Sequence, residues 1–119
     1  MVERGLLALV SALGCVASAC SLRQDPPPGA SGAEIYRLQN CANCHGDRGE
    51  GTSRGTALRE LGLHWTRDDL ADFLADPDVV LTRDARLQAQ RRPFSGAMSR
   101  YDNLTQDERE RLAEYLLGL

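Results

Sequence analysis

The sequence predicts an all-α fold, without a sheet, for a single folded domain. Three segments carry apolar side chains spaced by three or four residues, which places these side chains on one face of a helix. Two of these segments begin with a run typical of a helix N-terminus. No stretch alternates apolar and polar residues with a period of two, the pattern of a half-buried strand. The length of 119 residues fits one domain.

Two capping boxes mark predicted helix starts. Thr66 is followed at the third position by Asp69, and Thr105 by Glu108, so each hydroxyl and carboxylate can reach the other residue's backbone N–H. The helix after Thr66 is expected to end at Pro77, because proline cannot continue a helix. The helix after Thr105 carries an expected buried face made of Leu112, Tyr115, Leu116 and Leu119.

The other helical segments have weaker boundaries. A first helix is expected over about 33–41, where Ile35 and Tyr36 are apolar positions. A weaker helical pattern covers 83–91. Residues 46–64 contain five glycines and are expected to form a loop.

Residues 1–19 have the features of a signal peptide. Arg4 precedes an apolar run that ends at Val16. That run is too short to span a bilayer, which takes about 20 apolar residues. The small residues Ala17-Ser18-Ala19 satisfy the rule for secretory cleavage. We therefore expect the protein to be exported and to face the periplasm.

The next residue, Cys20, is a candidate lipidation site. The run before it also resembles a bacterial lipobox, and Cys20 has no other evident use at the cleavage point. A lipid on Cys20 would anchor the protein to a membrane. Ordinary cleavage, with Cys20 in a tail, and an uncleaved N-terminal anchor are the alternatives.

Residues 20–32, with three consecutive prolines, are expected to form a linker, and 33–119 the folded domain.

The composition narrows the class of protein. A formal net charge of −3 argues against a nucleic-acid partner, which would call for a basic patch. Aromatic residues make up only 5% of the chain. A small domain with so few aromatics has a thin core, which disulfides, a metal or a cofactor usually reinforce.

The run Cys41-Ala42-Asn43-Cys44-His45 is a C-x-x-C-H motif, which is typical of covalent c-type haem attachment. Two thiols three residues apart lie on neighbouring faces of one helical turn, so each can add to one vinyl group of the same porphyrin. His45 follows at once and can give an imidazole nitrogen to the iron. We therefore predict one covalent haem c on Cys41 and Cys44, with His45 as an iron ligand.

Other uses of the two thiols fit less well. A zinc site would need a second pair of ligands, and the candidates are Cys20 in the linker and His64. A thioredoxin-like redox motif would follow a strand in a βαβ unit, which the sequence does not suggest. A structural disulfide between cysteines so close together is strained.

Met98 is the candidate for the second axial ligand. It is the one methionine left once Met1 is removed, and it lies in a loop before the last helix. A thioether on the iron favours the reduced state and raises the potential. The alternatives are that Met98 is a core residue, or that His64 binds the iron and lowers the potential.

These features together resemble a small class I cytochrome c, with one haem, over residues 33–119. The pieces come in the family's order: a first helix, the CANCHG run, a glycine-rich loop, a middle helix, a methionine loop and a last helix. The resemblance implies three to five helices wrapped around one haem. It also implies that the first and last helices cross, with Gly32, Tyr36 and Tyr115 similarly placed.

Two runs depart from the family's common pattern. Gly55-Thr56-Ala57-Leu58 has Thr56 where the family often has a proline whose carbonyl holds the proximal histidine. A carbonyl is still available there. Met98-Ser99-Arg100-Tyr101 lacks the proline of the common Met-Pro-x-Phe run and keeps an aromatic residue.

The candidates for binding the haem propionates are Trp65, Arg91 and Arg92, from their position and donor type. The alternative is that Trp65 belongs to the core and that the arginine pair lies on a solvated face.

The predicted function is single-electron transfer in a respiratory or related chain. With both axial positions filled, the iron has no open site for a substrate, so we expect no catalytic residues and no enzyme activity. The partners would be a redox donor and acceptor, and a membrane through the lipid anchor. If Met98 does not bind, a five-coordinate iron would suit a sensor or a peroxidase. A haem subunit of a larger oxidoreductase is a third alternative.

Overall fold

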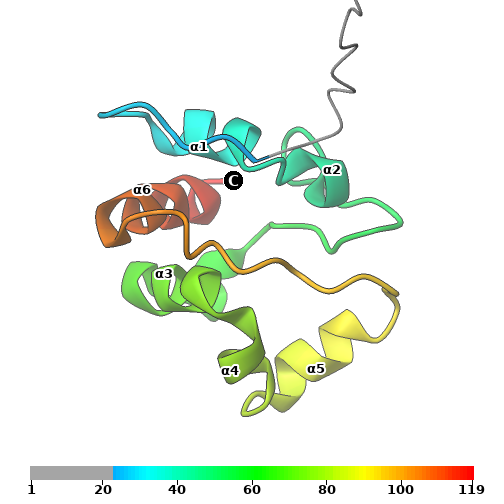
Figure 1. The fold of residues 1–119 in the computed structure, drawn as a ribbon. Coiled ribbons are helices and arrows are strands. Elements are labelled where there is room, and N and C mark those ends of the chain that lie inside the picture. Colours follow the sequence, from blue (N-terminus) through cyan, green and yellow to red (C-terminus); the bar gives the residue numbers. More distant parts are fainter. Residues whose placement is uncertain (1–22) are drawn as a thin grey trace, which may run out of the picture.

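The computed structural model describes residues 23–119, so the predicted signal peptide and Cys20 lie outside the described part. Within that part the fold is helical and has no strand, which confirms the all-α prediction. Thr52 and Gly55 form one isolated bridge. The elements, in chain order (Figure 1), are α1 (Gly32–Leu38), α2 (Ala42–His45), the 3₁₀ helix η1 (Leu61–Leu63), α3 (Arg67–Ala75), α4 (Pro77–Leu81), α5 (Ala85–Arg91) and α6 (Gln106–Leu117).

The predicted helix starts are in place. Thr105 accepts a bond from the N–H of Glu108 at 3.2 Å, and the Glu108 carboxylate accepts one from the N–H of Thr105 at 2.9 Å. Thr66 accepts from the N–H of Asp69 at 3.1 Å, but the described residues show no return bond from its own N–H. Aspartate is one methylene shorter than glutamate, so the Asp69 carboxylate does not reach back to the N–H of Thr66 as the glutamate of a complete capping box would. A third capping box, which the sequence analysis missed, starts α1 at Ser31.

Three boundaries differ from expectation. The first helix ends at Leu38 instead of continuing to 41, because Asn40 adopts a left-handed conformation (φ 58°) before α2 begins. Pro77 ends α3 as predicted, but it is also the first residue of α4, a position that needs no N–H. The 3₁₀ helix η1 lies within residues 46–64, which were expected to be loop throughout.

The first and last helices meet at a glycine. A Cβ atom on Gly32 would lie 2.6 Å from Cβ of Tyr115 and would also overlap the backbone oxygen of Arg111, so only glycine permits this approach. Next to this contact the rings of Tyr36 and Tyr115 pack edge to face, with centroids 5.5 Å apart. The packing of α1 on α6 that the resemblance implied is therefore present (Figure 1).

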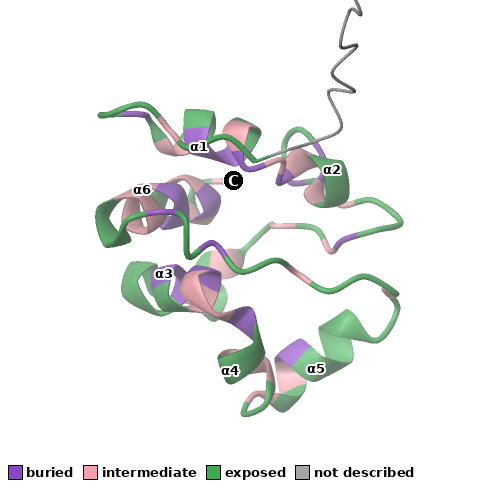
Figure 2. Ribbon diagram, viewed as in Figure 1, coloured by how far each residue is buried: buried purple, intermediate pink, exposed green. Residues whose placement is uncertain are grey.

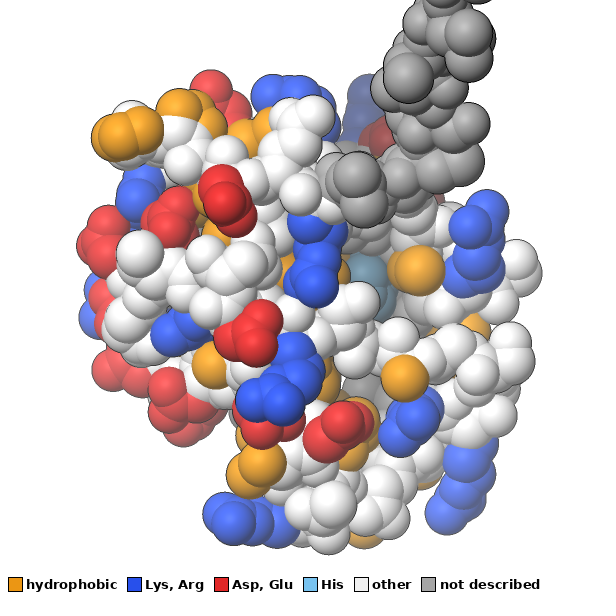
Figure 3. Space-filling view, in the orientation of Figure 1, with side chains coloured by type: hydrophobic (Ala, Val, Ile, Leu, Met, Phe, Trp, Pro, Cys, Tyr) orange, Lys and Arg blue, Asp and Glu red, His pale blue; other side chains and the backbone are white. Residues whose placement is uncertain are grey.

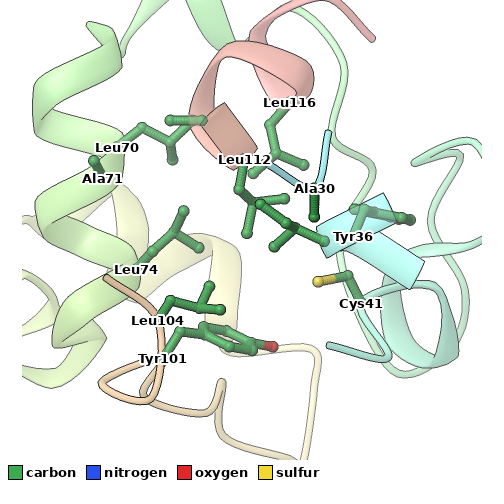
Figure 4. Packing of buried hydrophobic residues seen from close by; sticks show 12 residues of the cluster. Ala30, Tyr36, Cys41, Leu70, Ala71, Leu74, Tyr101, Leu104, Leu112 and Leu116 are labelled. Atoms are coloured by element: carbon green, nitrogen blue, oxygen red, sulfur yellow. The ribbon is translucent and has the colours of Figure 1, made fainter. Parts of the chain in front are cut away.

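The core lies between α1, α3 and α6. Ile35, Leu74 and Leu112, one from each of these helices, are almost fully buried. Figure 4 shows Leu74 and Leu112 among the packed side chains of this core. Leu116 is buried as predicted, whereas Tyr115 and Leu119 are only half-buried. Helices α4 and α5 lie to one side and are mostly exposed or half-buried (Figure 2). The core thus covers one part of the domain and leaves these two helices with few buried residues.

The chain before α1 also packs on the domain. The N–H of Gln24 donates to the carbonyl of Leu38 at 3.2 Å. Ala30 is buried, and its carbonyl accepts a bond from the Arg111 guanidinium. Part of the segment 20–32, which the sequence predicted to be a linker, therefore contacts the domain ahead of α1.

Among residues 23–119, no helix has the length and apolar character needed to cross a bilayer.

The contact at Gly32 makes a testable prediction for stability. Gly32→Ala should lower the free energy of unfolding by roughly 1–3 kcal/mol, because the new methyl group meets backbone that cannot move aside. The matched control is Gly62→Ala, since a Cβ atom on Gly62 has no neighbour within 4 Å. Chemical denaturation measures both variants. Equal stability of the two would show that the approach of α1 to α6 is not tight.

Candidate functional site

The imidazole of His45, the last residue of α2, is held by one backbone carbonyl. Its Nδ1 lies 2.8 Å from the carbonyl oxygen of Thr56. A carbonyl only accepts, so Nδ1 carries the proton and Nε2 keeps a lone pair that can bind a metal. Thr56 stands where the family often has proline, and the carbonyl expected there is in place.

The backbone on either side of His45 is fixed by further bonds. The Tyr36 hydroxyl donates to the Gly46 carbonyl at 2.6 Å in a buried setting. Burial raises the pKa of Tyr36 well above its ordinary value, so the hydroxyl stays protonated and remains a donor. The N–H of Gly51 donates to the carbonyl of His45 at 2.7 Å. The histidine therefore lies in a turn that is held by α1 and by two residues of the glycine-rich loop.

The glycine-rich loop packs closely on Cys44. The Thr52 hydroxyl donates to the Cys44 carbonyl at 2.6 Å. A Cβ atom on Gly55 would lie 2.7 Å from the same oxygen, so glycine is required for this approach. The loop thereby brings Thr56, the next residue, within reach of His45.

His45, Cys44 and Met98 line the same cavity. Figure 3 shows a histidine side chain in a hollow on this face of the molecule. Met98 is half-buried, as is His45. The remaining wall is largely apolar and includes Phe73, Leu81, Leu87, Phe94 and Ala97. The structure thus brings a nitrogen and a thioether sulfur, the two predicted iron ligands, to one apolar cavity.

The two motif cysteines have different surroundings. Cys44 is exposed and lines the cavity, whereas Cys41 is only 7% exposed and belongs to the core cluster. Figure 4 shows the Cys41 side chain among the core residues near Tyr101. Burial raises the pKa of the Cys41 thiol to about 11, and a hydrogen bond with Tyr101 offsets part of this rise. The sequence spacing alone could not distinguish the two thiols.

The other candidates divide between the cavity and the rest of the surface. His64 is exposed and does not line the cavity. Trp65 packs on Phe73 with ring centroids 5.1 Å apart and lies outside the cavity. Arg91 lines the cavity, whereas Arg92 lines a neighbouring hollow.

Arg54 also lines the cavity and was not identified from the sequence. No motif marked it, since only the path of the glycine-rich loop brings it there.

Cys20, one of the two further ligands that a zinc site would use, lies outside the described residues. No group of three or more His, Cys, Asp or Glu side chains within residues 23–119 is placed to hold a metal ion.

The hydroxyl of Tyr36 gives a prediction specific to this site. Tyr36→Phe should lower the free energy of unfolding by about 1–2 kcal/mol, because the buried Gly46 carbonyl loses its donor while the ring stack remains. Tyr115→Phe is the control, since the Tyr115 hydroxyl has no hydrogen-bond partner among residues 23–119. Thermal unfolding followed by circular dichroism compares them. If Tyr115→Phe lowered the free energy of unfolding as much as Tyr36→Phe, the stabilising role of the Tyr36–Gly46 hydrogen bond would be contradicted.

The comparisons with known proteins agree with this geometry. Residues 29–119 match the family model described as cytochrome c. Searches of curated proteins and of solved structures gave no match. The matched region covers the cysteine motif, the cavity and every helix of the described fold. The chain therefore belongs to the cytochrome c family, and its domain implies a covalently bound haem c.

Proposed function

We propose that the protein is a one-electron carrier, with a single haem c on Cys41 and Cys44 and the iron between His45 and Met98. The observation that carries this proposal is that His45 and Met98, far apart in sequence, line one apolar cavity. Family membership supports haem-based electron transfer in general. The choice of axial ligands is inferred from the residues of this chain.

Three of the residues proposed to hold the haem, Cys44, His45 and Met98, line the cavity, and Cys41 belongs to the core cluster. His45 presents Nε2, because its Nδ1 is bonded to the Thr56 carbonyl. Cys41 and Cys44 are within one turn at the start of α2, which suits attachment to two vinyl groups of one porphyrin. The apolar walls exclude water from the faces of such a ring. When bound, the haem supplies an iron that gains or loses one electron.

The protein's own part in the reaction is to hold the ligands in place. The Thr56 carbonyl fixes the orientation of the His45 ring and increases its basicity as a ligand. A thioether from Met98 would favour the reduced state. If His45 and Met98 both bound the iron, the site would have no place for a substrate, which favours a carrier over an enzyme.

Arg54 and Arg91 are the residues that we assign to the haem propionates. Both line the cavity, and neither forms an ion pair within the described part of the chain. A guanidinium pairs with a carboxylate through two parallel hydrogen bonds. Arg91 was a sequence-based candidate, and Arg54 takes the place of Trp65 and Arg92, which lie outside this cavity.

The charge distribution suggests the kind of redox partner. Residues 83–100 contain five arginines and one aspartate, whereas 66–78 contain one arginine and five aspartates. Figure 3 shows arginine side chains around the hollow and acidic side chains gathered mainly toward α6 and α3. We infer that donor and acceptor proteins present acidic surfaces to the cavity side, because opposite potentials guide productive encounter.

The cellular location that we propose rests on the N-terminal sequence. The apolar run and Ala17-Ser18-Ala19 support export, and Cys20 supports a lipid anchor on the periplasmic side. The carrier would then work at a membrane surface.

Covalent attachment can be tested by mass. The mature protein should carry the mass increment of one haem, which should survive denaturation because thioether bonds are covalent. Cys41→Ser together with Cys44→Ser should release the haem on denaturation. A mature protein without the increment would falsify the attachment.

The axial ligand is tested by optical spectra. The oxidised protein should show a far-red sulfur-to-iron charge-transfer band, and Met98→Ala should abolish the band and allow the reduced protein to bind carbon monoxide. Ser99→Ala is the control, because Ser99 does not line the cavity. A wild-type protein without the band, which binds carbon monoxide readily, would support a sensor or peroxidase instead.

A further inference from the structure

Residues 23–25 lie ahead of the part of the chain that matches the cytochrome c family, 29–119. They nevertheless contact two distant parts of the domain. One contact is at the end of α1, where Gln24 bonds to Leu38. The other is with the segment between α5 and α6, which follows Arg23 by 77 residues in the sequence. This short segment therefore bridges the beginning and the end of the domain.

Arg23 makes two contacts just after Met98. Its Nη1 donates to the carbonyl of Arg100 at 2.5 Å. Its guanidinium lies over the ring of Tyr101, 5.1 Å from the centroid. Tyr101 is buried, and its N–H donates to the Leu74 carbonyl of α3 at 2.9 Å. Arg23 therefore contacts a buried residue whose backbone is also bonded to α3.

Gln39 provides a second connection. It is only 2% exposed, and its Nε2 donates to the carbonyl of Gln24 at 2.7 Å. The Gln39 Oε1 accepts a hydrogen bond from Nδ2 of Asn103 at 3.2 Å. Nδ2 of Asn103 also donates to the Asp25 carboxylate at 3.3 Å. A buried amide that loses its partner is costly, so Gln39 favours the docked state of the segment.

The loop that carries Met98 has few bonds of its own. Residues 95–99 make no hydrogen bond or ion pair in the described structure. The bond from Phe94 to Arg91 holds one end of this loop. The other end is held at Arg100 and Tyr101, through Arg23, α3 and an exposed ion pair with Asp76. The position of Met98 thus depends on how firmly these ends are fixed.

We propose that Arg23 is a positioning residue for Met98, and that residues 23–25 clamp the end of the methionine loop against the domain. The proposal rests on the proposed role of Met98 as iron ligand. It also accounts for a departure noted in the sequence, since Ser99 replaces the proline that often stiffens this run. A contact from outside the family-matched region supplies the missing restraint.

The test uses the full haem-loaded chain with Arg23→Gln, which keeps a polar side chain and removes the charge. In the oxidised protein, imidazole competes with Met98, and the far-red band reports the displacement. We expect the apparent imidazole affinity to rise about three- to tenfold, as the loss of one hydrogen bond and one cation–π contact implies. Hydrogen exchange should become faster at the Tyr101 amide, which donates to the Leu74 carbonyl, and should stay unchanged in α1. Arg23→Lys should recover part of the effect.

The matched control is Arg59→Gln, because Arg59 is exposed and has no ion pair or hydrogen bond in the described chain. It should bind imidazole as the wild type does. If Arg23→Gln matches this control, the clamp is wrong while the Met98 assignment stands. If exchange rises in every helix, the effect is global and the clamp is also wrong. A wild-type protein without the far-red band would overturn both the ligand assignment and the clamp.

Discussion

The close approach of α1 and α6 at Gly32 is the contact on which the geometry of the site depends. It places the ring of Tyr36 against Tyr115, and so directs the Tyr36 hydroxyl to the Gly46 carbonyl, one residue after His45. The histidine is oriented in turn by Thr56. The helix contact therefore helps to fix the backbone beside His45 through one hydrogen bond, and Thr56 separately orients the imidazole that we propose to bind iron.

The sequence predicted those features that local chemistry decides. The capping boxes at Thr66 and Thr105 and the proline at 77 located the middle and last helices, since each acts within one turn. The C-x-x-C-H spacing, which also acts within one turn, predicts haem attachment at Cys41 and Cys44, and the cytochrome c family match covers this run. The break after Leu38 was missed because a left-handed Asn40 leaves no periodic signal. Arg54 was missed because its place in the cavity follows from the path of a loop.

The core is confined to α1, α3 and α6, and this explains why a cofactor belongs in the fold. Helices α1, α3 and α6 bury a conventional cluster, whereas α5 buries only Leu87 among its residues. Leu81 of α4, Leu87 of α5 and Phe94 of the following loop line the cavity, whereas Val79 of α4 is exposed. The proposed haem would thus be the partner against which this half of the domain packs, so that loading and folding of α4 and α5 are linked.

The docked chain before α1 changes how far the domain can move from a membrane. A free linker over 20–32 would let the domain sample many orientations. Because Arg23, the first described residue, contacts the domain, only three residue steps separate a docked residue from the proposed lipid on Cys20, a reach of at most about 10 Å. An anchored protein would therefore keep a narrow range of heights and tilts, and its partners would have to bring their redox centres close to the bilayer surface.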